Sequence, residues 1–339
     1  MLSVAIVGIT GYTGQVLYEL ISAHPDFNLT RVFARKGVGE SLKTYCPVLQ
    51  GAENFLIEAF DPNQPLNCDA VFLALPHASS HVFMKALMKQ NCKIFDLSAD
   101  FRFSSKEIFE KTYGVLHESP ELLDLIPYAL VDGVELDYQK PQAFAIPGCY
   151  ATAVNLALKP FLDVFKDAVT HCVVDAKSGV SGAGKSLSSD LLFCEVNESF
   201  KAYKSGCHRH EPEMAAFLGC DLFFSPHLIP QSRGILADCY LTLNRRFSMD
   251  EIQTLYEDAY QKAPFVSVQS PFTMLNTSCV QGSNFCHLAC HVFEDRPILL
   301  IQSAIDNLLK GASGQAIEVA NRAFNFHDQA GLPSQARLF

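Results

Sequence analysis

The chain has 339 residues, 49% hydrophobic and 18% charged, and is long enough for two domains of ordinary size. These proportions are typical of a well-packed enzyme and exclude wholesale disorder. The net charge of -10 argues against a nucleic-acid partner, which would require a basic face. An anionic substrate is compatible with this charge, because local cations and helix N-termini can form a positive pocket.

The first part of the chain alternates strand-like and helical patterns. Strands are predicted at residues 4–7, 29–34, 70–75 and 93–97. Helical spacing follows the first strand and returns at residues 80–89. Such alternation predicts a parallel, doubly wound sheet over roughly the first 150 residues.

The pattern changes after Cys149. One helix is predicted at residues 151–163, and the segment from Asp306 is helical again. Between them we expect strands near residues 170–178, 236–244, 285–293 and 298–303. The intervening segments are rich in Gly, Ser, Pro and His, which favours an α+β region with functional loops.

The sequence shows no signal peptide and no apolar run that approaches the ~20 residues of a membrane span. We therefore expect a cytoplasmic protein without a membrane partner. The twelve cysteines are scattered, so reduced thiols are expected and a disulfide framework is not. We also expect no metal site, since the closest cysteine pair, Cys286 and Cys290, lies in an apolar strand-like run.

A glycine-rich turn joins the first strand to the first helix. Its glycines are Gly8, Gly11 and Gly14, in GxxGxxG rather than GxGxxG spacing. Glycines let the backbone approach a pyrophosphate, and the helix N-terminus offers N–H groups and a positive dipole end. The pattern predicts dinucleotide binding, and a purely structural turn is the alternative.

The next strand ends at Ala34-Arg35-Lys36. An acid at this place would favour the 2′-hydroxyl of NAD, whereas a cation favours a 2′-phosphate. The first acid after the strand is Glu40. We therefore predict NADP(H) as the cofactor, with Arg35 at the 2′-phosphate, and a solvated basic turn as the alternative.

Cys149 stands between a Pro-Gly turn and a predicted helix. The helix dipole lowers the pKa of a thiol at this position, and the free N–H groups there can receive an oxyanion. His208, His210 and Glu213 form a second cluster, in which an imidazole can act as the base and the carboxylate can orient it. The alternatives are a buried structural cysteine and a His-x-His metal site.

A Gly/Ser-rich loop occupies residues 177–185. Its spacing does not match a Walker A motif, yet Lys185 and the loop backbone can hold a phosphate. Arg233 is a second candidate anion ligand. Each of these cations can equally be an ordinary loop residue.

Eight motifs together extend the interpretation over nearly the whole chain. They are GITGYTG at 8–14, DLSADFRF at 96–103, YGVLHESPEL at 113–122, IPGCYATA at 146–153, KSGVSGAGK at 177–185, HRHEPE at 208–213, PHLIPQSRGI at 226–235 and DNLLKGASGQA at 306–316. This ordered set closely resembles the N-acetyl-γ-glutamyl-phosphate reductase family of the arginine pathway. It resembles aspartate-semialdehyde and glyceraldehyde-phosphate dehydrogenases more distantly.

The resemblance implies an α/β fold with a Rossmann-type NADP-binding domain at 1–148. A catalytic and oligomerisation domain would follow at 149–305, and a helical segment at 306–339 would return to the first domain. Oligomers in the family suggest a homodimer or homotetramer.

The resemblance also implies roles for individual residues. Cys149 would be the nucleophile and His210 the acid–base group, supported by His208 and Glu213. The implied substrate contacts are Arg102, Lys185 and Arg233. The implied cofactor contacts are Gly8, Thr10, Gly11, Tyr12, Thr13, Gly14, Arg35, Ser181, Gly182 and Asn307.

Three positions depart from the family pattern. Phe33-Ala34 replaces the usual Ser or Thr before the arginine, so the 2′-phosphate contact depends more on Arg35. Ala151 replaces a frequent proline, and residues 126–132 replace a Tyr-Gly-Leu-Pro-Glu pattern. We assign no function to the last stretch.

The expected reaction is NADPH-dependent reduction of a small-molecule acyl phosphate through a Cys149 thioester. The substrate implied is N-acetyl-γ-glutamyl phosphate, and the alternatives are aspartyl or N-acetyl-aminoadipyl phosphate. A non-catalytic nucleotide sensor and a zinc-binding module are rivals from other classes. Retention of Cys149 together with the histidine cluster speaks against the sensor, and a metal analysis of the purified protein would decide about the zinc-binding module.

Overall fold

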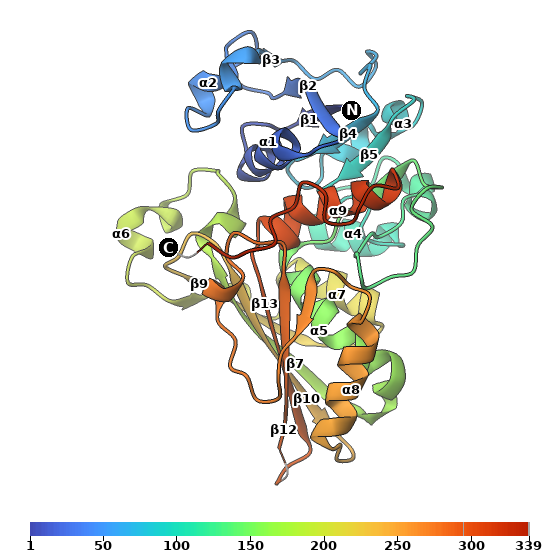
Figure 1. Cartoon of the computed structure of the whole chain (residues 1–339), viewed down its shortest axis with the longest axis vertical. Coiled ribbons are helices and arrows are strands. Elements are labelled where there is room, and N and C mark those ends of the chain that lie inside the picture. Colours follow the sequence, from blue (N-terminus) through green and yellow to red (C-terminus); the bar gives the residue numbers. More distant parts are fainter. Residues whose placement is uncertain (294, 338–339) are drawn as a thin grey trace. The chain divides into compact units, whose positions relative to one another are not determined.

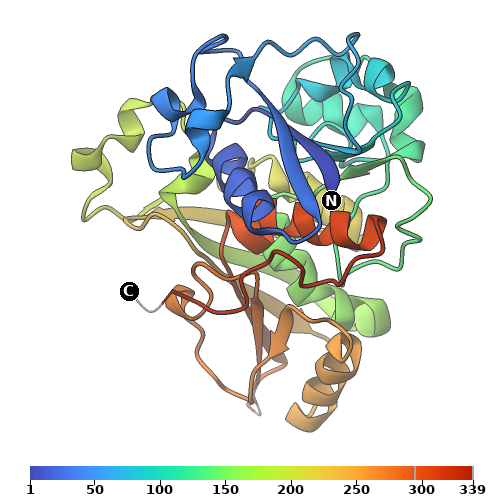
Figure 2. The ribbon, with the colours of Figure 1, turned by 45° about the horizontal axis from the view of Figure 1, so that its top comes forward.

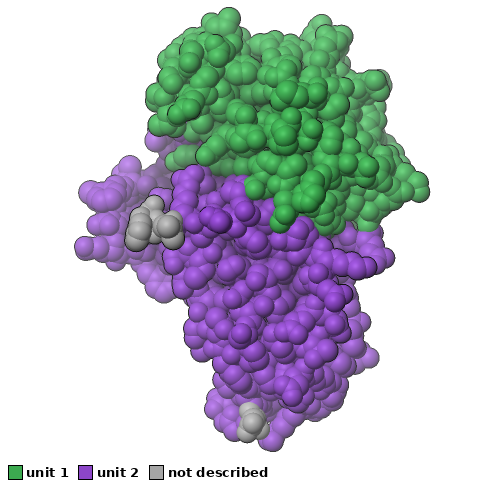
Figure 3. Space-filling model, in the orientation of Figure 1, with its two compact units in different colours: residues 1–131, 136–147, 312–332 green, residues 132–135, 148–311, 333–339 purple. Residues whose placement is uncertain are grey.

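The computed structural model describes residues 1–293 and 295–337, which form two compact units (Figure 3). Unit 1 comprises residues 1–131, 136–147 and 312–332. Unit 2 comprises the described parts of 132–135, 148–311 and 333–339.

Unit 1 is built on a parallel sheet with the strand order β3-β2-β1-β4-β5-β6 (Figure 1). Its strands are β1 (Leu2–Val7), β2 (Phe27–Phe33), β3 (Ile57–Glu58), β4 (Ala70–Leu73), β5 (Lys93–Asp96) and β6 (Ala143–Ala145). Its α-helices are α1 (Tyr12–Ala23), α2 (Leu42–Tyr45), α3 (Met84–Leu87), α4 (Lys106–Tyr113) and α9 (Gly314–Ala323). Short 3-10 turns occupy Ala52–Asn54, Ser80–Val82 and Pro120–Leu125. The strand order reverses between β1 and β4, so the predicted doubly wound sheet is confirmed.

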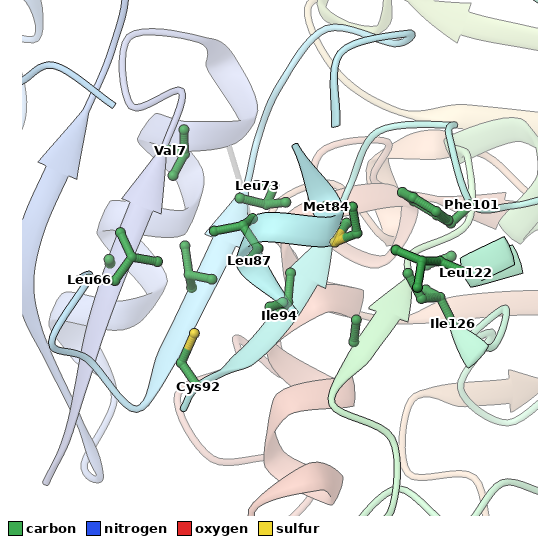
Figure 4. Packing of buried hydrophobic residues seen from close by; sticks show 14 of the residues in the cluster. Val7, Leu66, Leu73, Met84, Leu87, Cys92, Ile94, Phe101, Leu122 and Ile126 are labelled. Carbon is green, nitrogen blue, oxygen red and sulfur yellow. The ribbon is translucent and has the colours of Figure 1, made fainter. Parts of the chain in front are cut away.

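The core of unit 1 lies on both faces of this sheet. Strand β4 is fully buried, which matches its continuous apolar sequence. One side packs against α3 and the turn at residues 120–126, where Leu73, Leu87 and Ile94 meet (Figure 4). Figure 2 shows α1 and α9 side by side, although about 300 residues separate them in the chain.

The helix predicted at residues 80–89 is wrong as a single element. The segment splits into the 3-10 turn and α3, with Phe83 between them in a non-helical conformation. The cause lies elsewhere in the chain, because the Asp100 carboxylate accepts the N–H groups of Ala78, Ser79 and Ser80. This carboxylate supplies acceptors for the backbone N–H groups at the start of the segment and so fixes the segment as a turn.

Unit 2 is built on a mixed sheet with the strand order β11-β12-β13-β10-β7-β9-β8. Its strands are β7 (Val169–Gly179), β8 (Lys201–Ala202), β9 (Phe223–Ile229), β10 (Ile235–Leu243), β11 (Val266–Val268), β12 (Cys286–Val292) and β13 (Ile298–Ile305). Its α-helices are α5 (Cys149–Phe165), α6 (Phe193–Val196), α7 (His210–Leu218) and α8 (Met249–Tyr260). Short 3-10 turns occupy Lys166–Ala168, Val180–Ala183, Ser189–Leu191 and Thr277–Cys279, and a π-helical turn spans Leu309–Ser313.

One face of this sheet carries the core of unit 2. Alternate residues of β10, such as Cys239 and Leu241, are fully buried, and α5 and α8 pack over this side (Figure 1). Pro160 lies within α5 and has no N–H for the carbonyl of Leu156. The Tyr260 hydroxyl of α8 donates to that carbonyl and so joins the two helices.

The strands predicted for this unit are confirmed. The elements not predicted are β9, α7 and α8, and the shorter β8, β11 and α6. Strand β9 contains Pro226, which has no N–H to donate to a neighbouring strand. Its presence argues against a strand in the sequence, and β9 was therefore not predicted. Helix α8 did carry a signal, since Ser248 caps it and Glu251 completes a capping-box pattern.

Three kinds of feature are absent from the described residues. Within residues 1–293 and 295–337, no helix is long and apolar enough to cross a membrane. The same residues contain no group of three His, Cys, Asp or Glu side chains that could hold a metal ion. They include all twelve cysteines, none of which forms a disulfide.

Candidate active site

Cys149 is the first residue of α5 in unit 2. The preceding Gly148 is the N-cap, and its carbonyl accepts the first helical hydrogen bond from Thr152 N–H at 2.8 Å. Helix geometry leaves the N–H groups of the first turn without an acceptor four residues earlier. The thiol is half-buried at this positive helix end, where a thiolate or an oxyanion is stabilised.

Glu213 fixes the turn that precedes the cysteine. Its carboxylate accepts the N–H of Gly148 at 2.8 Å, and the side chain is only 1% exposed. Glu213 lies on α7, which packs against α5. A buried, charge-assisted bond of this kind holds the backbone beside Cys149 in one position.

His208 and His210 form a buried pair next to this turn. Their ring centroids lie 4.9 Å apart, and the N–H of His210 donates to Nδ1 of His208 at 3.1 Å. Burial, and then the charges of Arg209 and Lys204, lower the pKa of His208 to about 3. His208 is therefore neutral near pH 7 and serves as an acceptor that orients the start of α7.

Both imidazoles pack edge-on against Tyr150, the residue after the cysteine, with ring centroids 5.7 and 6.0 Å away. The Tyr203 hydroxyl donates to the Tyr150 hydroxyl at 3.2 Å, which in turn donates to the carbonyl of His227. Burial is the main reason why the pKa of Tyr203 is raised to about 12, and burial raises the pKa of Tyr150 even more. Both phenols thus stay protonated and form a hydrogen-bonded chain that ends at the carbonyl of His227.

A second group of polar residues gathers where β13 ends. Asn307 accepts the N–H of Gly234 at 2.8 Å and donates to the Ser181 hydroxyl at 2.9 Å. The Arg233 guanidinium lies 3.8 Å from the buried carboxylate of Asp306. Three residues predicted from separate loops, Ser181, Arg233 and Asn307, are therefore held close together.

The remaining predicted cations have different surroundings. Lys185 is the last residue of the Gly/Ser-rich segment 177–185, and its side chain is exposed. Arg102 is buried in unit 1, where its guanidinium donates to the carbonyls of Leu97 and Ile146 at 2.9 and 2.8 Å. These two bonds tie the loop after β5 to the segment that leads from β6 toward the cysteine turn.

The glycine turn of unit 1 fits a dinucleotide phosphate. Gly8 has a φ of +96°, and a Cβ there would lie 2.1 Å from the carbonyl oxygen of Ala74, just after β4. A Cβ on Gly14 would lie 2.4 Å from the Gly8 carbonyl oxygen, so α1 can begin close to the strand only with glycine. The turn thus lies where the strand order reverses, the place at which such sheets bind ligands.

The other predicted contacts of this turn are also placed by the structure. Thr10 and Thr13 offer their carbonyls to Gln15 and Ser313, and Tyr12 is 38% exposed. Arg35 follows β2 with an exposed side chain. The glycine turn and this cation thus belong to the same unit.

Sequence reasoning missed a buried acidic cluster after β5. The Ser80 hydroxyl donates to Asp96, which also accepts from Ser98, while Asp100 binds the 78–80 backbone. Burial, and then the nearby charge of Asp100, raise the pKa of Asp96 to about 7. The Asp-Leu-Ser-Ala-Asp run directly after a strand was the available signal, since strand ends carry functional loops.

Comparison with known proteins places these features in a family. Residues 3–133 match the model for the semialdehyde dehydrogenase NAD-binding domain, and residues 149–307 match its dimerisation domain. The chain is 38% identical to the N-acetyl-γ-glutamyl-phosphate reductase of Halorhodospira halophila, over 99% of both chains. It is 39% identical to the reductase of Nitrosococcus oceani, over 98% of both chains. The chain belongs to the N-acetyl-γ-glutamyl-phosphate reductase family.

A solved structure agrees with this family at the level of the fold. A probable aspartate-semialdehyde dehydrogenase from Pseudomonas aeruginosa superposes with a TM-score of 0.68 at 17% identity. The match covers 94% of this chain and 97% of that one. The resemblance and the fold class predicted from the sequence are therefore confirmed.

For this member of the reductase family, the structure unites motifs that lie far apart in the sequence. The cysteine turn and the HRHEPE cluster meet through Glu213 and Gly148. Tyr203 was missed, because no pattern marks it and only the fold brings its hydroxyl to Tyr150. The site roles assigned from sequence stay predictions.

Proposed function

We propose that this protein reduces N-acetyl-γ-glutamyl phosphate to N-acetylglutamate 5-semialdehyde, with release of phosphate and with NADPH as the reductant, in arginine biosynthesis. The observation that carries the proposal is the placement of Cys149 at the start of α5, beside a turn fixed by Glu213 and a buried histidine pair. The reductase family to which the chain belongs supports the same substrate. A thiol so placed suits acyl transfer.

The first step forms the thiolate. His210 accepts the proton of Cys149, and the helix N-terminus stabilises the sulfur anion. His208, neutral because burial lowers its pKa to about 3, accepts the His210 N–H and holds that residue in place. Glu213 keeps the turn before the sulfur fixed through Gly148.

The thiolate then attacks the acyl carbon of the substrate. A C–S bond forms, the bond from that carbon to the phosphate oxygen breaks, and phosphate leaves with a proton from solvent. N–H groups of the first turn of α5 stabilise the oxyanion formed on the way. Arg102, Lys185 and Arg233 are the proposed substrate contacts.

The cofactor would be held by the glycine turn of unit 1, with Arg35 at its 2′-phosphate. The proposed further contacts are Ser181, Gly182 and Asn307, of which Asn307 and Ser181 are joined by a hydrogen bond. When bound, the reduced cofactor would supply the hydride that converts the thioester to the anion of a hemithioacetal. As this collapses, the C–S bond breaks, the aldehyde leaves, and His210 returns its proton to the sulfur.

A single experiment tests the reaction and its substrate. We expect phosphate-dependent formation of NADPH from N-acetylglutamate semialdehyde and NADP, and no comparable rate with aspartate semialdehyde or the aminoadipate analogue. A preference for either of these would reassign the substrate. Folded protein that binds NADP without turnover on any of them would instead favour the nucleotide sensor.

The NADPH preference has its own test. Arg35→Ser should raise the KM for NADPH about tenfold or more, because a charged hydrogen bond is lost. The KM for NADH should not change, since NADH has no 2′-phosphate. An equal effect on both cofactors would contradict the assignment of Arg35.

We further propose that the protein forms a homodimer or homotetramer through the outer face of the unit 2 sheet. Phe223, Val173 and Tyr240 stand in register on β9, β7 and β10 and are 52, 39 and 40% exposed. The dimerisation-domain match covers these residues. Tyr240→Lys should lower the mass measured by sedimentation, and an unchanged mass would place the interface elsewhere. The cytoplasmic location stays a prediction.

A further inference from the structure

The chemistry above leaves a buried ion pair in unit 2 without a role. The ammonium group of Lys310 lies 3.3 Å from a carboxylate oxygen of Asp132, and their side chains are 0 and 3% exposed. Two charges are removed from water at a large cost, which attraction offsets only when the geometry is good. Such a pair in an enzyme is therefore worth testing for a function beyond stability.

Asp132 belongs to a short excursion of the chain. Residues 132–135 pack in unit 2, whereas the stretches before and after them, 1–131 and 136–147, pack in unit 1. Asp132 has a φ of +67°, a left-handed conformation that aspartate tolerates better than most residues. The ion pair is the side-chain bond that ties this excursion to Lys310.

Lys310 lies in the π-helical turn Leu309–Ser313, which follows β13. Gly311 N–H donates to the carbonyl of Asp306 at 3.0 Å, the five-residue bond of a π turn. The Asp306 carboxylate also accepts the N–H groups of Leu308 and Leu309, at 2.8 and 3.2 Å. Asp306 thus fixes the start of the turn, and the Lys310 ion pair holds its middle.

The residue after Lys310 lies against the cysteine. A Cβ built on Gly311 would lie 3.0 Å from the Cβ of Cys149 and 3.3 Å from its Cα. It would also lie 3.2 Å from Cδ1 of Ile305. The backbone of the π turn therefore packs directly on the first residue of α5, and any movement of the turn changes the space around the thiol.

We propose that Asp132, Lys310 and Gly311 are positioning residues for Cys149. The ion pair holds the π turn, and the turn, through Gly311, sets where the cysteine lies at the start of α5. The inference rests on the proposed role of Cys149 as nucleophile. It assigns a function to Asp132, in the stretch that departs from the family pattern.

The test measures the thiol directly. Each variant is treated with iodoacetamide, and mass spectrometry gives the alkylation rate of Cys149 relative to that of Cys207, an exposed cysteine of the same unit. General loosening of unit 2 acts on both thiols, whereas a displaced Cys149 alters the ratio. Turnover is measured beside it, with kcat and KM separated.

Gly311→Ala should change the alkylation ratio and lower kcat about tenfold to a hundredfold, because a small misplacement of a reacting group is that costly. KM should change much less, since substrate contacts remain. The double variant Gly311→Ala/Ile305→Val is the matched control, because valine lacks the Cδ1 atom that a Cβ at residue 311 would approach. If the effect arises from crowding against Ile305, the double variant recovers, and the proposal for Gly311 fails.

Asp132→Asn keeps the shape and the left-handed preference of the residue but removes its charge. We expect it to lower kcat and shift the ratio in the same direction as Gly311→Ala, with partial recovery in Asp132→Glu. Asp238→Asn is the matched control, because it breaks another largely buried pair, with Lys177 at 2.8 Å. The control should alter stability without a change in the alkylation ratio.

The outcomes separate this inference from the proposed function. Unchanged alkylation ratios and kcat in Gly311→Ala and Asp132→Asn, in a protein that loses turnover with Cys149→Ser, would overturn the positioning role alone. Asp238→Asn with the same effect as Asp132→Asn would do so too. Wild-type protein without turnover would instead remove the nucleophile on which the inference rests.

Discussion

In unit 1 the glycine turn between β1 and α1 offers a ligand mainly backbone N–H groups, whereas in unit 2 the cysteine is surrounded by side chains that other side chains hold. In the turn of unit 1, Gly8 and Gly14 are needed because a Cβ at either position would collide with neighbouring backbone. Around Cys149, by contrast, Glu213, His208 and Tyr203 each make a side-chain hydrogen bond. The two units should therefore respond to different kinds of substitution.

The largest effect is expected at the thiol of unit 2. Cys149→Ser should lower turnover at least about a thousandfold, because serine lacks an accessible anion near neutral pH. Binding of NADPH, measured by fluorescence titration, should stay within a factor of two or so of wild type. Loss of cofactor binding in this variant would show that the units do not divide the work as proposed.

The next effect concerns the bond between Glu213 and the cysteine turn. Glu213→Ala should lower kcat about tenfold to a hundredfold, because Gly148 N–H loses its acceptor and the turn moves. Glu213→Gln keeps an acceptor oxygen and should recover part of the rate. Equal losses in both variants, measured by steady-state kinetics, would mean that the negative charge matters rather than the position.

In unit 1 a backbone-based site should be sensitive to a single methyl group. Gly11→Ala suits the fold, since its φ is −76° and the new Cβ would lie 3.5 Å from its nearest neighbour, the Gly8 carbonyl oxygen. The unfolding free energy should change by less than about 1 kcal/mol. The affinity for NADPH should fall about tenfold or more, because the pyrophosphate can no longer approach the N–H groups. Calorimetric titration with unchanged affinity would move the phosphate site away from this turn.

The smallest effects distinguish the units by the sign of their pH dependence. Asp96 in unit 1 has a pKa raised to about 7 by burial, against an ordinary value of 3.8. The folded chain therefore binds a proton that the unfolded chain releases between those values, and stability falls as pH rises through that window. Asp96→Asn should remove this fall, a change in slope of about 1.4 kcal/mol per pH unit.

His208 in unit 2 contributes to the pH dependence of stability with the opposite sign. Its pKa is lowered from 6.5 to about 3, so between those values the unfolded chain binds a proton that the folded chain does not. Stability is therefore lost as pH falls through 6.5. His208→Asn, which keeps an acceptor for the His210 N–H, should remove this loss. Urea unfolding at several pH values measures the slope of stability against pH in wild type and in each variant. If the two substitutions changed the wild-type slope in the same direction, the pKa directions would be contradicted.

The type of fold and the candidate chemistry could be predicted from local sequence patterns. Alternating apolar patterns are local, and so the parallel sheet of unit 1 and the main strands of unit 2 could be predicted from them. The glycine turn and the Pro-Gly-Cys turn are also local, since each depends on a few adjacent residues beside a strand or a helix. The predicted residues Cys149, His208 and His210 follow from such motifs.

The contacts that distant segments make with those motifs could not be predicted from the sequence and are visible in the folded chain alone. The Asp100 carboxylate accepts backbone N–H groups at the start of the segment 80–89 and so prevents the single helix predicted there. The Glu213 carboxylate accepts the N–H of Gly148, a contact between residues far apart in the sequence. The excursion of residues 132–135 to Lys310 has no signal in the sequence. A buried charge shows its partner only when the fold brings the two together, because sequence separation does not limit hydrogen bonds and ion pairs in a packed interior.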